Sequence, residues 1–512
     1  MKVELTSQLA SATGALVAQA VKTRFASELF AANPTLWGTD AEDESSRRLG
    51  WVHSLERWYP LVEEVEGVRA GLAAQGVNHV VLCGMGGSSL APEVTAAHFQ
   101  KTLTVVDTTH PNQLGPILSG DLSATVVVVA SKSGGTLETD SQKRAFEGAF
   151  RNQGIDPADR IIVVTDPDTL LHKSASDAGY RVFLGDEDMG GRFSVLGPFG
   201  IVPCVLAGID MLEVLQQAQV ARGILATDSP NNPGIILGAG IAVQAPRVNK
   251  VILHEQPGFP GFGDWVEQLV AESSGKDGVG LVPVLGSHDA GYDDSISVGG
   301  QGSDVLVQGT LGELFLLWEV ATAFACQVLG VNPFDQPNVE SAKIAAKALL
   351  ESPDVAPREE WQVEGFSLWS SPGLTRMPVL DEVLAQWKSH LHGDRYGAVC
   401  VFGNQKLTGA WNQSVQALEA KAQRPVTLGF GPRFLHSTGQ LHKGGPAQGV
   451  FLQVIQVPDP IAAIPGRDFD FGTLMLAQAH GDANVLANAG LTVLSITAST
   501  DQLPTLWEAL ES

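Results

Sequence analysis

The chain has 512 residues, of which 44% are hydrophobic, and its formal net charge is −24. Because a single ordinary hydrophobic core does not grow to this length, we expect two or three domains. The acidic balance argues against nucleic acids and anionic membranes as partners, since both would repel the protein.

The cysteines and the first residues indicate a cytoplasmic protein. The four cysteines lie in apolar surroundings without a CxxC pair, which is typical of buried thiols in a reducing compartment: Cys83, Cys204, Cys326 and Cys400. The first ten residues, MKVELTSQLA, are polar and lack the apolar core of a signal peptide.

The first half of the chain predicts helices followed by a parallel sheet. Residues 1–75 have helical patterns, and between residues 79 and 186 short apolar runs alternate with helix-length segments. The runs are HVVLCG, TLTVVD, TVVVVA, RIIVVTD and YRVFLG. They predict a five-stranded, mostly parallel sheet with helices on both faces. Helical patterns follow to about residue 226, and SPNNPG at 229–234 is typical of a boundary.

The second half resumes the alternation. NKVILHEQ and VGLVPVLG predict strands, and a long helix over Leu311–Leu329 is expected to end at Gly330 and Pro333. We expect residues 351–377, which contain several Pro, Ser and Trp, to be irregular. A third block from about residue 396 has four more strand patterns: GAVCVFG, PVTLGFG, GVFLQVIQV and LTVLSITA. The pattern leaves open whether this block is separate or completes the second sheet.

We therefore predict an α/β protein with two doubly wound, mostly parallel sheet domains and a helical amino-terminal segment. The expected limits are 1–75 for the helical segment, 76–228 for the first α/β domain and 229–512 for the second.

Two loops rich in glycine and hydroxyl groups follow predicted strands. The first is GMGGSSLAP, at 84–92 after HVVLC, and the second is SKSGGT, at 131–136 after TVVVVA. Each precedes a predicted helix, so backbone N–H groups and a positive helix end should meet at the carboxyl edge of the sheet. Three hydroxyls and two glycines in SKSGGT exceed what helix capping needs. The pair of loops predicts a phosphate site.

A dinucleotide site is the alternative for the first loop. Gly84, Gly86 and the later acidic Asp107 partly match the fingerprint of such sites. However, the third glycine position is Ser89, and the second loop has no role in a dinucleotide site. We therefore do not favour NAD.

Two charged residues are candidates for chemistry. Glu272 ends the helical pattern DWVEQLVAESSGK, where an isolated carboxylate is more often a solvated charge. Arg192 follows two glycines in GGRFSVLGPFG, a place suited to stabilising an oxyanion.

Taken in order, five motifs resemble the glucose-6-phosphate isomerase (phosphoglucose isomerase) family. They are GMGGSSLAP, SKSGGT.ET, GGRFSVL, QL.AESSGK and NPFDQPNVESAK, and they span residues 76–346. The likeness is greatest to the isomerase half of chains that fuse a transaldolase to it, because FGPRFLHSTGQLHKGG at 430–445 is similar to the carboxyl-terminal region of those chains. No transaldolase barrel is expected here, so the second activity is not implied.

The resemblance implies two sugar isomerase (SIS) domains and reversible isomerisation of glucose 6-phosphate and fructose 6-phosphate, in glycolysis and gluconeogenesis. Glu272 would be the base, Arg192 would stabilise the cis-enediolate, and Lys343 would assist ring opening. The implied substrate-binding residues are Gly87, Ser88, Ser131, Lys132, Ser133, Thr136, Gln268 and Gln336. Gln268 and Glu272 are four apart and should share a helix face. The chemistry needs no metal and no cofactor.

The ring-opening histidine departs from the family pattern. The interval from Ser273 to Val331 contains only His288, without the family's motif, whereas the similar string STGQLH ends at His442. We expect that this segment has moved in the sequence but not in space, which makes the carboxyl-terminal block a rearranged part of the second domain. His442 is the expected catalytic histidine, and His436 and His288 stay open as alternatives.

Two other functions are alternatives to glucose 6-phosphate isomerisation. One is an isomerase of another sugar phosphate, or one that also accepts mannose 6-phosphate, and the other is a non-catalytic sugar-phosphate sensor. A sensor could lose Glu272 and Arg192, and both are present. A homodimer is expected from the resemblance.

Overall fold

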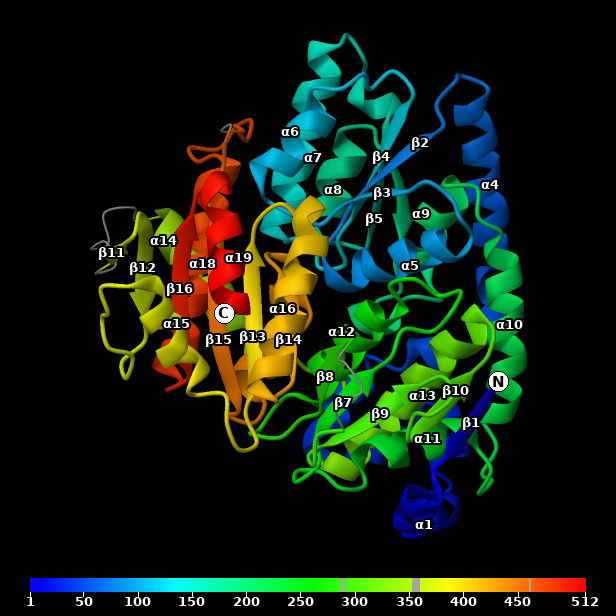
Figure 1. Ribbon diagram of the computed structural model, residues 1–512. Coiled ribbons are helices and arrows are strands. Elements are labelled where there is room, and N and C mark those ends of the chain that lie inside the picture. Colours follow the sequence, from blue (N-terminus) through cyan, green and yellow to red (C-terminus); the bar gives the residue numbers. More distant parts are fainter. Residues whose placement is uncertain (287–290, 352–359, 460–461) are drawn as a thin grey trace.

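The computed structural model describes residues 1–286, 291–351, 360–459 and 462–512, and the described strands form three sheets. In Figure 1 the first sheet and its helices lie at the top, the second sheet at the lower right, and the carboxyl-terminal block, coloured yellow to red, beside both. The α/β class with mostly parallel sheets is confirmed.

The first sheet has the strand order β3-β2-β4-β5-β6, and all its pairs are parallel. Its strands are β2 His79–Cys83, β3 Thr104–Val106, β4 Thr125–Ala130, β5 Ile161–Thr165 and β6 Arg181–Leu184, as the five apolar runs predicted. Every residue of β4 and β5 is buried, because helices cover both faces. Since β2 and β4 are parallel neighbours, the loops that follow them meet at one edge.

The second sheet has the order β1-β10-β9-β7-β8 and recruits the amino terminus. Its strands are β1 Lys2–Leu5, β7 Lys250–Leu253, β8 Val282–Leu285, β9 Ser295–Gly299 and β10 Val305–Gln308. The expectation that residues 1–75 hold only helices misses β1, which pairs antiparallel with β10. A four-residue edge strand carries little local signal, and its partner lies some 300 residues away in the sequence. The helices α1 Ser7–Lys22 and α4 Tyr59–Ala73 follow it.

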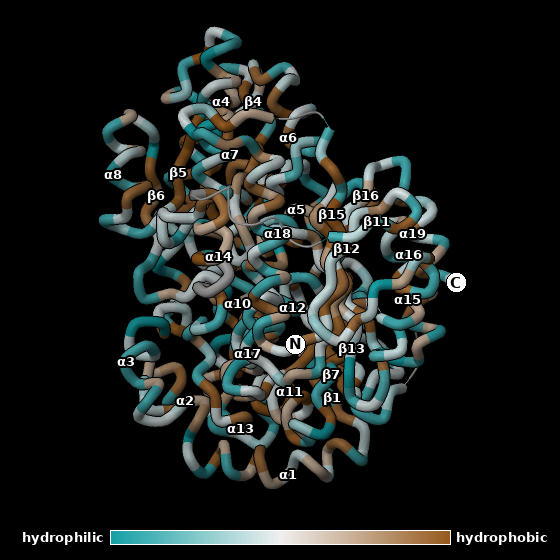
Figure 2. The backbone as a smooth tube through the Cα atoms, turned by 90° about the vertical axis from the view of Figure 1, so that its left-hand side faces the viewer, coloured by the Kyte–Doolittle hydropathy of each residue, from teal (hydrophilic) through white to brown (hydrophobic). Residues whose placement is uncertain are grey.

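The carboxyl-terminal block builds its own six-stranded sheet, in the order β11-β12-β16-β15-β13-β14. The four predicted strands are β13 Tyr396–Phe402, β14 Val426–Phe430, β15 Gly449–Gln456 and β16 Thr492–Ala498. This block therefore does not complete the second sheet. Figure 2 shows β13 and β15 among the hydrophobic parts of the trace, and every residue of both strands is buried. The domain limits at residues 76 and 229 stay predictions.

The segment 351–377 is not irregular throughout. It holds a hairpin of β11 Trp361–Val363 and β12 Phe366–Ser370, while residues 352–359 lie outside the described residues. The two residues between the strands, Glu364 and Gly365, have φ of 50° and 88°, as a tight hairpin turn of the primed type requires. Glu-Gly is a weak signal for that turn, which explains why the pattern failed.

The long helix α13 Leu311–Leu329 is confirmed, and it ends at Gly330, whose φ is 74°. Among the described residues it is the one helix long and apolar enough to cross a membrane, but 83% of that apolar window is buried inside the protein. It packs against α10 Met211–Leu225, α11 Pro233–Ala242 and α12 Phe262–Ser274. These contacts are those of a core helix, and they place α12 next to the site described below.

Candidate active site

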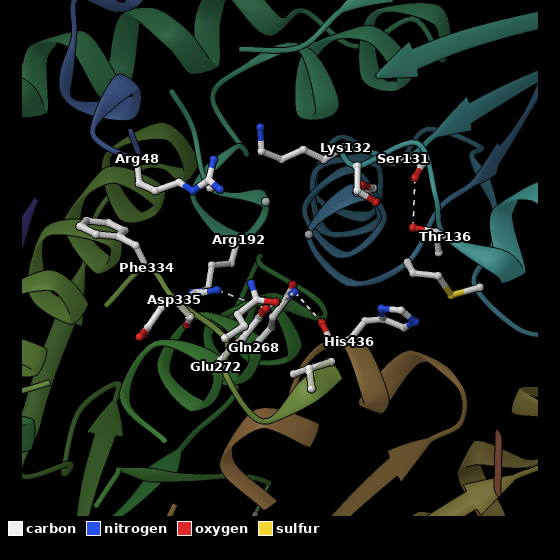
Figure 3. Close-up of a pocket in the computed structure, with 18 of the residues that line it drawn as sticks. Arg48, Ser131, Lys132, Thr136, Arg192, Gln268, Glu272, Phe334, Asp335 and His436 are labelled. Atoms are coloured by element: carbon white, nitrogen blue, oxygen red, sulfur yellow. Dashed lines mark hydrogen bonds and ion pairs between the residues drawn. The ribbon is translucent and has the colours of Figure 1, made fainter. Parts of the chain in front are cut away.

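A cavity of about 610 Å³ opens at the carboxyl edge of the first sheet. The regions around all three sheets contribute to its wall: Figure 3 shows Ser131 from the first, Gln268 from the second and His436 from the carboxyl-terminal block. The predicted site residues that line it are Gly87, Ser88, Ser131, Lys132, Ser133, Thr136, Arg192, Gln268, Glu272, Gln336, Lys343 and His436. Residues more than 300 positions apart in the sequence therefore converge on one space.

The two predicted phosphate loops face this cavity from neighbouring strands. The turn Gly86–Ser88 follows β2, and the loop 131–136 runs from β4 to the start of α7 Leu137–Asn152. Ser131 Oγ donates a hydrogen bond of 3.0 Å to Thr136 Oγ1, which closes the second loop. The hydroxyls and the N–H groups at the start of α7 form a concave group of donors. This end of the cavity is suited to a phosphate.

Lys132 does not direct its ammonium at these hydroxyls. Its Nζ forms an ion pair with Asp166 and donates a 3.0 Å hydrogen bond to the backbone oxygen of Asp186. In Figure 3 its side chain extends away from Ser131 and Thr136. Burial raises the pKa of Asp166 although the Lys132 ammonium opposes that shift. A phosphate here would rely on hydroxyls and backbone N–H groups.

The carboxylate of Glu272 is held on both oxygens. Arg192 Nη1 lies 3.2 Å from Oε1, and Gln268 Nε2 donates to Oε2 at 3.0 Å. Gln268 and Glu272 do share a face of α12, and both are buried. Glu272 is therefore an oriented, water-shielded carboxylate beside a guanidinium rather than a solvated helix end.

Arg192 and Lys276 together fix the loop that carries Gln336. Arg192 donates to Ser273 Oγ at 2.8 Å and to the backbone oxygens of Pro333 and Asp335. Lys276 Nζ donates to the backbone oxygen of Asp335 at 2.9 Å and to its carboxylate at 2.6 Å. Burial, followed by the nearby Arg192 charge, lowers the pKa of Lys276. The buried side chains of Arg192 and Lys276 thus hold this loop in place through hydrogen bonds to its backbone oxygens.

His436 enters the cavity from the carboxyl-terminal block. It ends the turn Arg433–His436, and its Nε2 lies 2.8 Å from Glu138 Oε1. Gln478 Nε2 donates to the same oxygen at 2.6 Å. Burial would raise the pKa of Glu138, but the pKa is lowered by the charge and hydrogen bond of His436 and by the Lys343 charge. Glu138 is the glutamate of the SKSGGT.ET motif, so the sequence contains a local signal for this residue.

The structure places His442, the expected catalytic histidine, away from the cavity wall. Of the described residues, His442 is not among those that line the cavity. It lies on the short helix α17 Gly439–Gly444, which turns its ring toward the third sheet, 5.0 Å from the Phe451 ring centroid. Burial and the Lys443 charge lower the pKa of His442 to about 3. His288 lies outside the described residues.

Further residues of the cavity wall were not predicted. Arg48 and Glu44 come from the amino-terminal segment, and Arg48 Nε lies 2.7 Å from Glu44 Oε1. Asp335 lines the wall beside Gln336. No local motif marks Glu44 or Arg48, because only the packing of the amino-terminal segment against the first sheet brings them there.

The chain is similar in sequence and in fold to known proteins. Residues 52–288 match the family model described as phosphoglucose isomerase. A probable glucose-6-phosphate isomerase of Methanococcus maripaludis is 25% identical over 377 residues, which cover 58% of this chain and 82% of that protein. Residues 52–288 are therefore similar to the phosphoglucose isomerase family.

Other similarities to the phosphoglucose isomerase family differ in extent. A probable glucose-6-phosphate isomerase of Haloarcula marismortui is 33% identical over 219 residues, or 41% of this chain. The matched region spans 50% of the length of that relative. The crystal structure of a glucose-6-phosphate isomerase from Chlamydia trachomatis matches with a TM-score of 0.54 and 18% identity, over 69% of this chain and 89% of that one. The structural match shows a shared fold.

The turns at Gly87 and Gly191 pack so closely that position 87 has no room for a side chain. A Cβ at position 87 would lie 2.4 Å from the backbone oxygen of Gly191, so Gly87→Ala must push the first phosphate turn away from the turn that carries Arg192. Since a displacement of ~1 Å can cost ~10²-fold in rate, we expect kcat/KM for the sugar phosphate to fall by about that factor. Steady-state kinetics measure it.

Gly71→Ala is the matched control for this substitution. Position 71 lies in α4, and no described heavy atom outside the helix backbone lies within 4 Å of a Cβ placed there. This variant should keep wild-type kinetics. Equal activity of Gly87→Ala and Gly71→Ala would contradict the close packing of the two turns.

Proposed function

We propose that this protein interconverts glucose 6-phosphate and fructose 6-phosphate through a cis-enediolate. The observation that carries the proposal is one cavity lined by two phosphate loops, an arginine-paired carboxylate and a carboxylate-paired histidine. Aldose–ketose isomerisation needs a base, a cation for the developing oxyanion and an acid–base group for the ring. All three side-chain types face the same space here.

In the proposed mechanism, the phosphate binds the hydroxyls and N–H groups at Ser88 and at 131–136. His436 donates a proton to the ring oxygen as its bond to C1 breaks, the C1 hydroxyl gives up its proton to water to leave the C1 aldehyde, and Lys343 assists at the C1 oxygen. Glu272 then removes the C2 proton of the aldose and returns it to C1, while one proton leaves the C2 oxygen and one is added to the C1 oxygen, and Arg192 stabilises the enediolate oxygen. The Glu138 carboxylate, 2.8 Å from Nε2 of His436, orients the imidazole.

We assign ring opening to His436 rather than His442, and the support for this choice is that His436 lines the cavity. We favour catalysis over a non-catalytic sensor because Glu272, Arg192 and His436 are buried or half-buried and mutually oriented, which binding of a phosphate alone does not need. The cytoplasm as location remains a proposal that rests on the buried free cysteines, and the homodimer as assembly remains one that rests on the family resemblance.

Replacement of the base tests the proton transfer between C2 and C1. Glu272→Gln keeps the size of the side chain but cannot accept a carbon-bound proton, so kcat should fall by ~10²–10⁴-fold with little change in KM. A coupled assay of fructose 6-phosphate conversion measures both constants. A variant that retains more than about a tenth of the wild-type kcat would place the base elsewhere.

His436→Ala tests ring opening separately. 5-Deoxyfructose 6-phosphate has no hydroxyl able to close a ring on its carbonyl, so exchange of its C1 proton with solvent needs the base alone. We expect kcat for fructose 6-phosphate to fall by ~10²-fold and this exchange to stay within about threefold of wild type. NMR in deuterated water measures the exchange.

The control for His436→Ala is His442→Gln, which alters the histidine that packs beside Phe451. It should leave the ratio of the two rates as in the wild type. A selective loss of ring opening in His442→Gln, with none in His436→Ala, would restore the role to His442.

Dialysis against a chelator tests whether side chains alone perform the reaction. Because the proposed steps use carboxylate, guanidinium, imidazole and ammonium side chains together with water, and no metal ion, activity should be unchanged after exhaustive treatment with EDTA. Loss of activity that a divalent metal ion specifically restores would require a different mechanism.

A further inference from the structure

We propose that Arg433 is a positioning residue for ring opening, because it fixes the turn that carries His436 against the helix that carries the base. The inference rests on the proposed function. Arg433 begins the turn Arg433–His436 and lies outside the cavity wall, so its effect on substrate would be exerted through that turn.

Three carboxylates from two other parts of the molecule meet the Arg433 guanidinium. Its Nη1 lies 3.2 Å from Glu93 and 3.3 Å from Asp107, and its Nη2 lies 3.6 Å from Asp264. The Asp107 side chain is 2% exposed and that of Arg433 is 19% exposed, so this one pair is shielded from solvent, whereas the side chains of Asp264 and Glu93 are 39% and 49% exposed.

The partners of Arg433 belong to the elements that build the site. Glu93 lies on α5 Leu90–His98, which begins directly after the first phosphate turn. Asp107 follows β3, and Asp264 is in the first turn of α12. One guanidinium therefore connects the phosphate turn, the base helix and the histidine turn. A lysine, with a single point charge, could not match all three carboxylates.

The histidine turn is attached to α12 at both of its ends. Arg433 pairs with Asp264, and the backbone oxygen of His436 accepts a 2.8 Å hydrogen bond from Gln268. Asp264 and Gln268 are four residues apart on one face of the helix. Because the two attachment points on α12 lie one helical turn apart, they fix both the position and the direction of the segment Arg433–His436. The Gln268 contact alone would let this segment pivot.

The charge balance around Arg433 makes it hard to replace. Burial and the nearby Asp264 carboxylate raise the pKa of Glu267 to about 8, and Arg433 opposes this shift. Removing the guanidinium would leave its carboxylates facing one another without their cation, and the turn would move. Glu272 would keep its contacts with Arg192 and Gln268, since neither involves Arg433.

The test compares Arg433→Gln and Arg433→Lys on the two substrates used for His436→Ala. We expect Arg433→Gln to lower kcat for fructose 6-phosphate by ~10- to 100-fold with little change in KM, while C1 proton exchange of 5-deoxyfructose 6-phosphate stays within about threefold. Arg433→Lys should recover part of the loss. Arg467→Gln removes another ion pair between the carboxyl-terminal block and the first sheet's helices, with Asp140 at 2.7 Å, and should leave both rates unchanged.

A double substitution decides whether Arg433 acts through His436. If it does, Arg433→Gln combined with His436→Ala should be no slower than His436→Ala alone, because the effects are coupled. Additive losses, or equal losses on both substrates, would overturn the inference. Should Arg433→Gln fail to fold, Arg433→Lys serves in the same cycle. If His436→Ala itself shows no selective loss, the failure belongs to the proposed function instead.

Discussion

The hydrogen bond from Gln268 to the backbone oxygen of His436 is the contact on which the rest of the site depends. Gln268 Nε2 binds that oxygen at 2.8 Å and the Glu272 carboxylate at 3.0 Å. One amide group thus sets the distance between the proposed base and the proposed ring-opening histidine, although the two residues come from different parts of the fold. Gln268 is buried, and in a low-dielectric environment its hydrogen bonds are directional and costly to break.

An acidic protein can bind a phosphate here because the local donors are neutral or already oriented. The net charge of −24 opposes an approaching anion at long range. Within the cavity, Lys132 is paired with Asp166 and Arg192 with Glu272, so neither offers an unopposed charge. The donors proposed for the phosphate are the hydroxyls and N–H groups of the two loops, which line the same cavity. They recognise the shape and hydrogen bonding of a phosphate more than its charge.

Charged side chains also replace regular structure at the meeting point of the three sheets. Arg192 and Lys276 hold the loop at 332–335, and Arg433 holds the turn before His436. A guanidinium or ammonium can satisfy several carbonyl and carboxylate oxygens at once, which a short loop cannot do for itself. The price is sensitivity to substitution at these positions.

The sequence by itself determined the strands of the first sheet, the two phosphate loops, and the shared face of Gln268 and Glu272. Each depends on residues within one element, where period and loop composition specify local geometry. Only the tertiary structure decided the rest. It brought His436 rather than His442 to the cavity, paired His436 with Glu138, placed β1 beside β10 and brought Arg48 to the cavity wall. These outcomes depend on packing between segments up to about 300 residues apart, and no local pattern encodes which faces will meet.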